Sequence, residues 1–561
     1  MVISARHWLR NDGHKYVLLA AWLGLNGVVF WRTYSKYKSE PEFFYLREML
    51  GKGLCISRGT ADVLNLNCAF VLLPMCRTLL TSLRRSRKVA RRRVRKYIDQ
   101  AKQIHVVCAI LVCLAAVIHT GAHIVNVVNS SQHYNKDFPE INIASCQNEN
   151  PTKVLFCSVA GTTGFLMIII LCAIFTSSTR AVRTASYEVF WYIHHLFIVF
   201  YILLLFHASS GVLKMQRNVQ VHIPGCLMLN KSEIMTYAEN TYQMNIAPVT
   251  CESPPIFHRI HQETWMWVIF PLIFYFLERI VRFLRSRYQE ATIENVIRHP
   301  CEVIEIRFTK NHFPGQPGQY IMLNIPSIST MQWHPFTLTT QPNAEVTSYS
   351  IHIRVLGDWT IQLQELFDAT TETTQEIQKH EKTRKFPKMY IDGPFGSPSQ
   401  DIFEFGVSVC IAGGVGVTPF AAALNKLRYN TDDTKKLRRI YFIWICRDIA
   451  CFQWFSDLIV ELHTKLWESN KPDFFNVELY STQENMNEEN IVPYSEYPFH
   501  RITVGRPRWK AVFKEIAKFH QRSEVGVFVC GPRSLSRSVH KRCNQRNKYN
   551  TRFVYHKESF C

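Results

Sequence analysis

The sequence predicts a membrane protein in two parts. A bundle of six transmembrane helices comes first, and a cytosolic region built from a β-barrel and a doubly wound α/β domain follows. Long hydrophobic runs fill the first half of the 561 residues, whereas short alternating strands and strand–helix repeats fill the second half. The formal net charge of +21 does not indicate nucleic-acid binding, because much of it lies in the run 84–96, between two hydrophobic segments.

Six segments are apolar enough to cross a bilayer, which takes about 17–25 residues. They are 16–34, 60–82, 104–128, 154–176, 189–212 and 265–284. Lys and Arg gather before the first segment and after the second, fourth and sixth. The positive-inside rule therefore places both termini in the cytosol. We expect residues 1–288 to form a lipid-embedded domain whose outer loop is 213–262.

Two features flank these spans. The basic run 84–96 has two interpretations: a topology determinant beside anionic lipid, or a docking surface for the protein's own cytosolic half. On the outer side, where disulfides persist, Cys226 and Cys251 are candidates for a bridge, and Cys146 is an alternative partner. Asn129 and Asn230 stand in glycosylation sequons on the same side.

Residues 289–397 are predicted to form a small β-barrel, with strands at 303–309 and 349–355. Residues 398–561 alternate apolar strands, at 407–412, 440–446 and 525–530, with helical stretches. That alternation predicts a parallel, doubly wound sheet. The polar stretch 369–384 is expected to be a surface insertion.

Six histidines lie inside two of the spans, where ionisable side chains are functional candidates. The third span carries His105, His119 and His123, and the fifth carries His194, His195 and His207. On a helix, the 14 residues from His105 to His119 correspond to about 21 Å along the axis and about 40° around it. We expect two stacked haems, with His105 and His194 at the inner one and His119 and His207 at the outer one. Buried, hydrogen-bonded histidines are the alternative.

The fifth span does not fit an ideal helix. The 13 residues from His194 to His207 leave their side chains about 140° apart, and His195 improves this only to about 120°. A local distortion is required, and the choice between His194 and His195 stays open. Iron with two axial histidines has no free position, so such a haem carries electrons and does not bind oxygen.

Three motifs in the barrel suit FAD. His334-Pro335-Phe336-Thr337 offers aromatic and hydroxyl groups at a strand, and 317–320 (PGQY) forms a tight turn. Arg354 supplies a guanidinium for the pyrophosphate. Gly357-Asp358-Trp359-Thr360 is the expected start of a helix, where phosphate binds well.

The last domain carries the signs of a nicotinamide nucleotide site. Gly413, Gly414 and Gly416 follow a strand and lead through Thr418 and Pro419 into a helix, which suits a pyrophosphate. Cys530-Gly531-Pro532 ends another strand and is expected beside the nicotinamide. Arg447 and Arg506 are placed to accept a 2′-phosphate, which favours NADPH over NADH. DGPFG, at 392–396, marks the junction with the barrel.

HPFTL, IHIRVLGDWT, DGPFG, GGVGVTP, CRD and CGP follow the membrane histidines in that order. Over essentially its whole length the chain resembles the NADPH oxidases of the phagocyte-oxidase type. The resemblance implies a ferredoxin-reductase-like cytosolic region, two b-type haems and electron transfer to O2. It also implies a cytochrome b light chain as membrane partner, and an aromatic side chain, here Phe560, that stacks on the flavin. In this chain Cys561 follows Phe560, which departs from the family's terminal aromatic.

Within this family the chain is most similar to the renal-type branch, at 64–68, 73–78, 222–226 and 557–561. That similarity implies mainly hydrogen peroxide as product. His222, in the outer loop, is a candidate proton donor that converts superoxide to peroxide. Endoplasmic reticulum and plasma membrane both suit the topology. A ferric or cupric reductase on the same core is the nearest alternative, and a channel with a nucleotide-sensing half is a more distant one.

Overall fold

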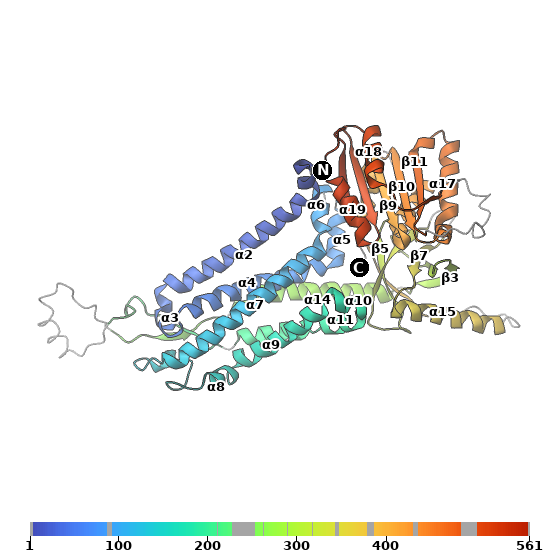
Figure 1. Ribbon diagram of the computed structural model, residues 1–561. Coiled ribbons are helices and arrows are strands. Elements are labelled where there is room, and N and C mark those ends of the chain that lie inside the picture. The colour runs from blue at the N-terminus through green and yellow to red at the C-terminus, as the bar shows by residue number, and fades with distance from the viewer. Residues whose placement is uncertain are drawn as a thin grey trace, which may run out of the picture. The chain divides into compact units, whose positions relative to one another are not determined.

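The structure is a computed structural model. It describes residues 4–86, 92–209, 211–226, 253–261, 263–288, 290–316, 318–342, 347–377, 386–429, 436–483 and 502–558. The chain divides into two compact units, and Figure 1 shows their elements. The first unit comprises Met1–Leu18, Arg77–Asp99 and Leu277–Cys561, and the second comprises Leu19–Cys76 and Gln100–Phe276. Phe560, Cys251, Asn230 and Pro317, which the sequence singles out, lie outside the described residues.

The second unit is helical. Its elements are α2 (His14–Ser39), α3 (Phe44–Leu50), α4 (Lys52–Val71), α7 (Ala101–Gln132), α8 (Pro151–Phe156), α9 (Val159–Ser177), α10 (Arg180–Ala185), α11 (Tyr187–His194), α12 (Phe197–Ala208) and part of α14 (Thr264–Tyr288). α4 packs against α7, and α9 packs against α12. Many apolar side chains of these helices are exposed, as expected where lipid is the solvent.

Among the described residues, four helices or broken helices are long and apolar enough to cross a membrane: Ala5–Ser39, Ala101–Gln132, Val159–Ser177 and Tyr187–His207. A fifth is added if Lys52–Met75 and Arg77–Arg85, which meet at a 68° bend, form one span. The predicted sixth span lies in α14, whose final turns carry Glu278 and several arginines. α14 is not among the helices of the described residues that are long and apolar enough to cross a membrane.

The fifth span is broken where the sequence required a distortion. α11 ends at His194, His195 and Leu196 form a turn, and α12 begins at Phe197. His194 and His207 therefore lie on two helical segments and not on one ideal helix. This break removes the angular conflict that an ideal helix creates.

The outer region contains a short antiparallel sheet of β1 (Lys214–Gln216) and β2 (Phe257–Arg259). Cys226 is disulfide-bonded, and Cys251 lies outside the described residues. Asn129 lies within α7 and donates a hydrogen bond to the carbonyl of Leu50 at 2.9 Å. Glycosylation at its sequon stays a prediction.

The barrel is an antiparallel sheet of β3 (Thr292–His299), β4 (Val303–Thr309), β5 (Tyr320–Asn324), β6 (His334–Thr340), β7 (Tyr349–Arg354) and β8 (Tyr390–Phe395). Its strand order is β3-β4-β7-β6-β5-β8, and a bridge between Ala291 and Met389 joins the two ends. Ile304, Ile306 and Phe308 alternate along β4 and face the barrel core. The predicted strands at 303–309 and 349–355 are confirmed as β4 and β7.

The last domain is a parallel sheet with helices on both faces. Its strands are β9 (Val407–Gly413), β10 (Arg439–Cys446), β11 (Phe475–Ser481), β12 (Ile502–Val504), β13 (Glu524–Cys530) and β14 (Arg552–Glu558), in the order β12-β11-β10-β9-β13-β14. α16 (Thr418–Tyr429) and α17 (Ser456–Glu468) cover one face, and α18 (Trp509–Phe519) and α19 (Arg533–Cys543) cover the other (Figure 1). The predicted doubly wound sheet is thereby confirmed.

The expected surface insertion begins as a helix. α15 (Asp358–Ile377) starts within the GDWT motif and continues into the stretch 369–384, so that stretch is not wholly a loop. Residues 378–385 lie outside the described part of the chain.

The basic run contacts the α/β domain within the first unit, through α5 (Arg77–Arg85) and α6 (Arg92–Ile98). Arg84 pairs with Asp99 and, at 3.2 Å, with Asp401. Arg95 also binds Asp401, at 2.7 Å, and Arg92 pairs with Glu524. For these arginines, the structure shows contact with the α/β domain of the same chain.

Candidate active site

The inner pair of predicted haem ligands comes together in the second unit. His105 lies near the start of α7 and His194 is the last residue of α11. Their ring centroids are 6.2 Å apart, with the ring planes at 60°. Two imidazoles on one iron need about 6 Å between centroids, given metal–nitrogen bonds of about 2.0–2.1 Å on each side.

The outer pair has the same geometry. The rings of His119, on α7, and His207, on α12, lie 6.4 Å apart at 61°. The same helix therefore presents a histidine to each of the two segments of the fifth span. This spacing leaves room for one iron between the rings of each pair.

Each of the four rings has its Nδ1 atom engaged by a polar group. The carbonyl oxygens of Val71, at 2.8 Å, and Ser57, at 3.0 Å, contact His105 and His119 respectively. His194 contacts the Ser178 hydroxyl at 3.2 Å, and His207 contacts the Thr163 hydroxyl at 3.1 Å. A hydrogen bond at Nδ1 leaves Nε2 as the metal-binding nitrogen and orients the ring. The four residues therefore fit bis-histidine haem ligation.

The neighbouring histidines lie differently. His195 contacts the carbonyl of Trp191 through Nδ1 at 2.7 Å and packs edge-on against the Trp191 ring. His123 packs edge-on against His119, with centroids 4.5 Å apart. That distance is well below the 6.2 Å and 6.4 Å of the two predicted ligand pairs, so His123 does not repeat their geometry. The spacing favours His194 over His195 as the inner ligand.

The flavin motifs converge at one end of the barrel. The ring of His334, at the start of β6, stacks on that of Trp359, at the start of α15, at 4.2 Å. Phe336 lies over the same indole at 6.1 Å. Burial lowers the pKa of His334 to about 4, so the imidazole is neutral at pH 7. Thr337 is buried on β6 opposite Tyr320 of β5, and Pro335 pairs with Met322.

The predicted phosphate-binding turn is well formed. The Thr360 hydroxyl accepts hydrogen bonds from the backbone of Leu356, at 2.9 Å, and Gly357, at 3.0 Å. α15 begins at Asp358, four residues after Arg354, the exposed last residue of β7. A guanidinium beside a helix N-terminus suits a pyrophosphate.

The glycine turn lies at the switch point of the α/β sheet. β9 lies between β10 and β13, so the strand order reverses at β9. In such sheets, ligands bind at the carboxyl ends of the strands where the order reverses. A β-carbon at Gly416 would lie 2.4 Å from the carbonyl oxygen of Cys530, and one at Gly413 would lie 2.8 Å from Pro532. Glycine is therefore required for GGVG to pack on the CGP motif. Gly531, with φ 155°, and Gly414, with φ 57°, adopt backbones that favour glycine.

The turn leads directly into α16, whose first residues, Thr418 and Pro419, are buried. The two predicted 2′-phosphate arginines are exposed after two strands of the sheet: Arg447 follows β10, and Arg506 follows β12. Only β11 separates those strands. The Ser481 hydroxyl, at the end of β11, donates to the Arg447 carbonyl at 3.1 Å.

The two nucleotide motifs face each other within the first unit. Arg354 Nη1 lies 3.9 Å from the position of a β-carbon at Gly414. The Arg354 guanidinium, suited to one pyrophosphate, thus lies beside the glycine turn, suited to another. Hydride transfer between two nucleotides needs their binding sites to be this close.

In the second unit, His222 is buried, with 0% exposure, and both ring nitrogens are engaged. Its Nε2 shares a hydrogen bond of 2.6 Å with the Tyr45 hydroxyl, and its Nδ1 contacts the carbonyl of Ser253 at 2.8 Å. No pattern in the sequence indicates Tyr45 as its partner.

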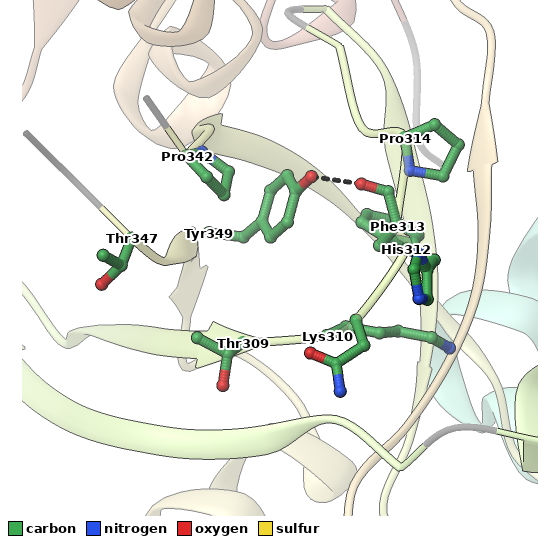
Figure 2. Close-up of a pocket in the computed structure, with 9 residues that line it drawn as sticks. Thr309, Lys310, His312, Phe313, Pro314, Pro342, Thr347 and Tyr349 are labelled. Carbon is green, nitrogen blue, oxygen red and sulfur yellow. Dashed lines mark hydrogen bonds between the residues drawn. The ribbon is translucent and has the colours of Figure 1, made fainter. Parts of the chain in front are cut away.

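A separate hollow lies on the barrel, lined by residues of the β4–β5 and β6–β7 connections (Figure 2). The Tyr349 hydroxyl donates to the carbonyl of Phe313 across it. Burial lowers the pKa of Lys310, at its edge, to about 8. None of its lining residues belongs to the nucleotide motifs.

Several supporting residues were missed from sequence alone. Thr163 and Ser178, which hold His207 and His194, are hydroxyl residues of apolar segments, and a search for polar side chains in the spans would have found them. Arg282, which binds Asp392 of DGPFG at 2.6 Å, was counted only as a topology signal.

Three family models match the chain. "Ferric reductase like transmembrane component" matches residues 59–205, "FAD-binding domain" matches 288–399 and "Ferric reductase NAD binding domain" matches 405–544. The chain is thus an integral membrane protein with FAD- and NAD-binding domains.

Curated relatives match the chain from end to end. It is 44% identical over 582 residues to NADPH oxidase 4 of Mus musculus and to that of Homo sapiens, covering 100% of each pair of chains. It is 35% identical over 592 residues to NADPH oxidase 1 of Mus musculus, covering 100% of this chain and 96% of the relative. These relatives favour an oxidase over a metal reductase. The chain belongs to the NADPH oxidase family and is a transmembrane NADPH-dependent oxidoreductase.

Proposed function

We propose that the chain passes electrons from NADPH, through FAD and two b-type haems, to O2 on the opposite side of a membrane. The observation that carries this proposal is the pair of histidine–histidine distances, 6.2 Å and 6.4 Å, each suited to one iron. When bound, FAD accepts a hydride and gives up single electrons, and each haem relays one electron.

The chain's own residues bind and orient these groups. Arg354 and the first turn of α15 are placed to bind the FAD pyrophosphate. His334, Phe336 and Trp359 offer a stacked, uncharged wall for the flavin, and Phe560 is the residue proposed to stack on it. The glycine turn 413–416 receives the NADPH pyrophosphate, with Cys530-Gly531-Pro532 beside the nicotinamide.

Arg447 and Arg506 select NADPH by its 2′-phosphate, which adds negative charge between two exposed guanidinium groups. In the membrane, His105 with His194 holds the inner haem, and His119 with His207 holds the outer one. The Nδ1 hydrogen bonds hold each ring in position, so that little reorganisation accompanies electron transfer.

The product proposed is superoxide that is converted mainly to hydrogen peroxide. His222 and Tyr45 share a short, buried hydrogen bond, through which a proton can pass to a reduced oxygen species. His222→Phe should lower the peroxide fraction while NADPH consumption continues. An unchanged peroxide-to-superoxide ratio would remove His222 from the reaction.

The wider setting is part of the same proposal. The chain crosses the membrane six times with both termini in the cytosol, in the endoplasmic reticulum or plasma membrane. It pairs with a cytochrome b light chain, as its family resemblance implies. Co-purification with that subunit, and protease accessibility of each terminus in sealed vesicles, test these two points.

The deciding experiment compares His194→Ala with His195→Ala in membranes given NADPH. His194→Ala should lose half of the dithionite-reduced haem absorbance and more than 90% of O2 consumption. His195→Ala should retain both haems. Loss of haem from His195→Ala alone would contradict the ligand assignment. Full O2 consumption by both variants would contradict the electron path.

A further inference from the structure

Two cysteines from different domains meet where the barrel packs on the α/β domain, inside the first unit. Cys301 lies in the turn between β3 and β4, and Cys451 lies in η7 (Ile449–Phe455), which follows the CRD motif. Their Sγ atoms are 2.6 Å apart, and both are free thiols. Non-bonded carbon atoms sit about 3.5–4.0 Å apart, whereas a disulfide bond is about 2.05 Å long. The pair thus lies nearer to bonding distance than to ordinary contact.

Neighbouring contacts hold this thiol pair in place. Trp454, in η7, donates a hydrogen bond from Nε1 to the carbonyl of Pro300 at 2.8 Å. The ring of Phe455 packs on that of His352, on β7, at 4.5 Å. Both contacts join η7 to the barrel beside the two sulfur atoms.

The backbone at Cys301 gives no local reason for a cysteine. Cys301 and Glu302 have φ values of 61° and 57°, in the left-handed region that favours Gly, Asn or Asp. A cysteine is less stable than glycine in this conformation. What it brings to the turn is its side chain, which reaches Cys451.

Cys451 is the more reactive thiol of the pair. A hydrogen bond from Cys446 lowers its pKa to about 7, against the effect of burial and with a further contribution from Cys301. The lowered pKa raises the thiolate fraction of Cys451, and the thiolate is the form that peroxides oxidise.

We propose that a hydroperoxide converts Cys301 and Cys451 to a reversible disulfide that ties the FAD barrel to the NADPH domain. The Cys451 thiolate attacks one peroxide oxygen, the O–O bond breaks, and the departing hydroxide takes a proton to become water. Cys301 then attacks the Cys451 sulfenic acid, the S–S bond forms and a second water leaves. In sum, two thiols and one hydrogen peroxide give one disulfide and two waters. When the peroxide is the enzyme's own product, the disulfide acts as feedback on turnover, and that role rests on the proposed function.

The position of the disulfide determines its effect. Cys446, which contacts Cys451, directly precedes Arg447, one of the two arginines assigned to the 2′-phosphate. NADPH must enter and NADP⁺ must leave at the junction of Arg354 and Gly414, which requires freedom between the two domains. A covalent tie beside this junction therefore slows NADPH turnover.

The test uses the full-length holoenzyme in detergent, treated with hydrogen peroxide and then blocked with N-ethylmaleimide. Digestion and mass spectrometry should yield a Cys301–Cys451 cross-linked peptide that a dithiol reductant removes. NADPH oxidation with ferricyanide as acceptor should fall at least twofold on oxidation and recover on reduction. Cys301→Ser and Cys451→Ser should lose both responses, while Cys157→Ser, in the other unit, retains them.

Three results would overturn the inference: no Cys301–Cys451 peptide, a Cys446–Cys451 peptide in its place, or an equal rate loss in Cys301→Ser. Failure of the proposed function would give a different experimental result. An enzyme that reduces ferricyanide with NADPH but never O2 would contradict the proposed electron path, and the mapped disulfide would still decide this inference.

Discussion

Arg282, near the end of α14, donates a hydrogen bond from Nε to Asp392 of the DGPFG motif at 2.6 Å. Arg285 binds the other oxygen of the same carboxylate. The ring of Phe395 lies 5.3 Å from the Arg282 guanidinium and 5.6 Å from that of Arg285. One carboxylate, 2% exposed, therefore anchors α14 to the last barrel strand.

Asp392→Asn should destabilise the barrel strongly. Arg282 is almost fully buried, and removing the partner of a buried charge costs about 3–5 kcal/mol. We expect a loss of stability at the lower end of this range, because the amide oxygen of the new Asn side chain still accepts a hydrogen bond. The measurement is the melting temperature of the purified enzyme, with flavin release as a second signal.

Glu290→Gln is the matched control, because Glu290 forms an exposed ion pair with Lys388 in the same domain at 3.4 Å. Such surface pairs contribute about 0–1 kcal/mol. Equal melting temperatures for Asp392→Asn and Glu290→Gln would show that the anchor does not stabilise the barrel.

Gly416→Ala should impair the NADPH site. The new β-carbon would lie 2.4 Å from a backbone oxygen of Cys530, so the turn must shift, at a cost of about 1–3 kcal/mol. We expect the KM for NADPH to rise by about tenfold or more, the equivalent of 1.4 kcal/mol. Steady-state NADPH oxidation with ferricyanide gives the KM.

Gly406→Ala, in the same domain, is the control. A β-carbon there has its nearest neighbour at 3.7 Å, an ordinary contact. Its KM and stability should match those of the wild type. If Gly416→Ala kept the wild-type KM, the glycine turn would not be the pyrophosphate site.

The strands and the glycine turn could be predicted because local rules determine them. Apolar side chains alternate along 303–309, which identifies the face of the strand that lies in the barrel core. An apolar strand followed directly by GGVG is typical of a strand–turn–helix unit. The choice of His194 over His195 stays a prediction. The sequence demanded a distortion of the fifth span but could not locate the helix break at 195–196, which no proline or glycine marks.

The ion-pair partners of the basic run 84–96 also could not be predicted from the sequence. Arg84 and Arg95 meet Asp401 across more than 300 residues of chain, and no local pattern encodes such a pairing. The same holds for Cys301 and Cys451, which neighbour each other only after two domains have packed.

Thr163→Val tests the support of His207, a proposed ligand of the outer haem. The Thr163 hydroxyl donates to the carbonyl of Val159 at 2.5 Å, so it accepts the hydrogen bond from His207 Nδ1 at 3.1 Å. That hydrogen bond makes the imidazole a stronger donor to iron and favours the ferric state. Its loss should raise one haem potential by on the order of 20–60 mV, the one-electron equivalent of about 0.5–1.5 kcal/mol.

A spectroelectrochemical titration of the purified enzyme measures both potentials. Thr162→Val is the control, because the Thr162 hydroxyl contacts only the carbonyls of Ser158 and Val159 among the described residues. A shift of both potentials, or an equal shift in Thr162→Val, would contradict the assignment of His207.

Glu558, on β14, should make stability fall as pH rises. Its carboxylate accepts hydrogen bonds from the Ser399 hydroxyl at 2.7 Å and the Ser399 backbone at 3.1 Å. Burial raises the pKa of Glu558 to about 7; the Ser399 hydrogen bonds oppose this, and the charge of Asp99 adds to it. The pKa of Asp99 is itself raised to about 6, chiefly by burial.

Between a pH of about 4.5, the ordinary pKa of glutamate, and the raised value of about 7, the folded protein holds a proton that the unfolded chain has released. The stabilisation is therefore complete below this window and is lost as pH rises through it. Glu558→Gln keeps a neutral group at the site, so its melting temperature at pH 8 should exceed that of the wild type by roughly 2–4 °C.

The melting temperature should be followed from pH 5.5 to pH 8.5, with Glu461→Gln as the control for an exposed carboxylate on α17. Glu558→Gln should flatten the curve without abolishing its slope, because Asp99 titrates in the same range. A curve parallel to that of the wild type would show that Glu558 ionises freely in the folded protein. In that case the contact between β14 and Ser399 would not sense pH.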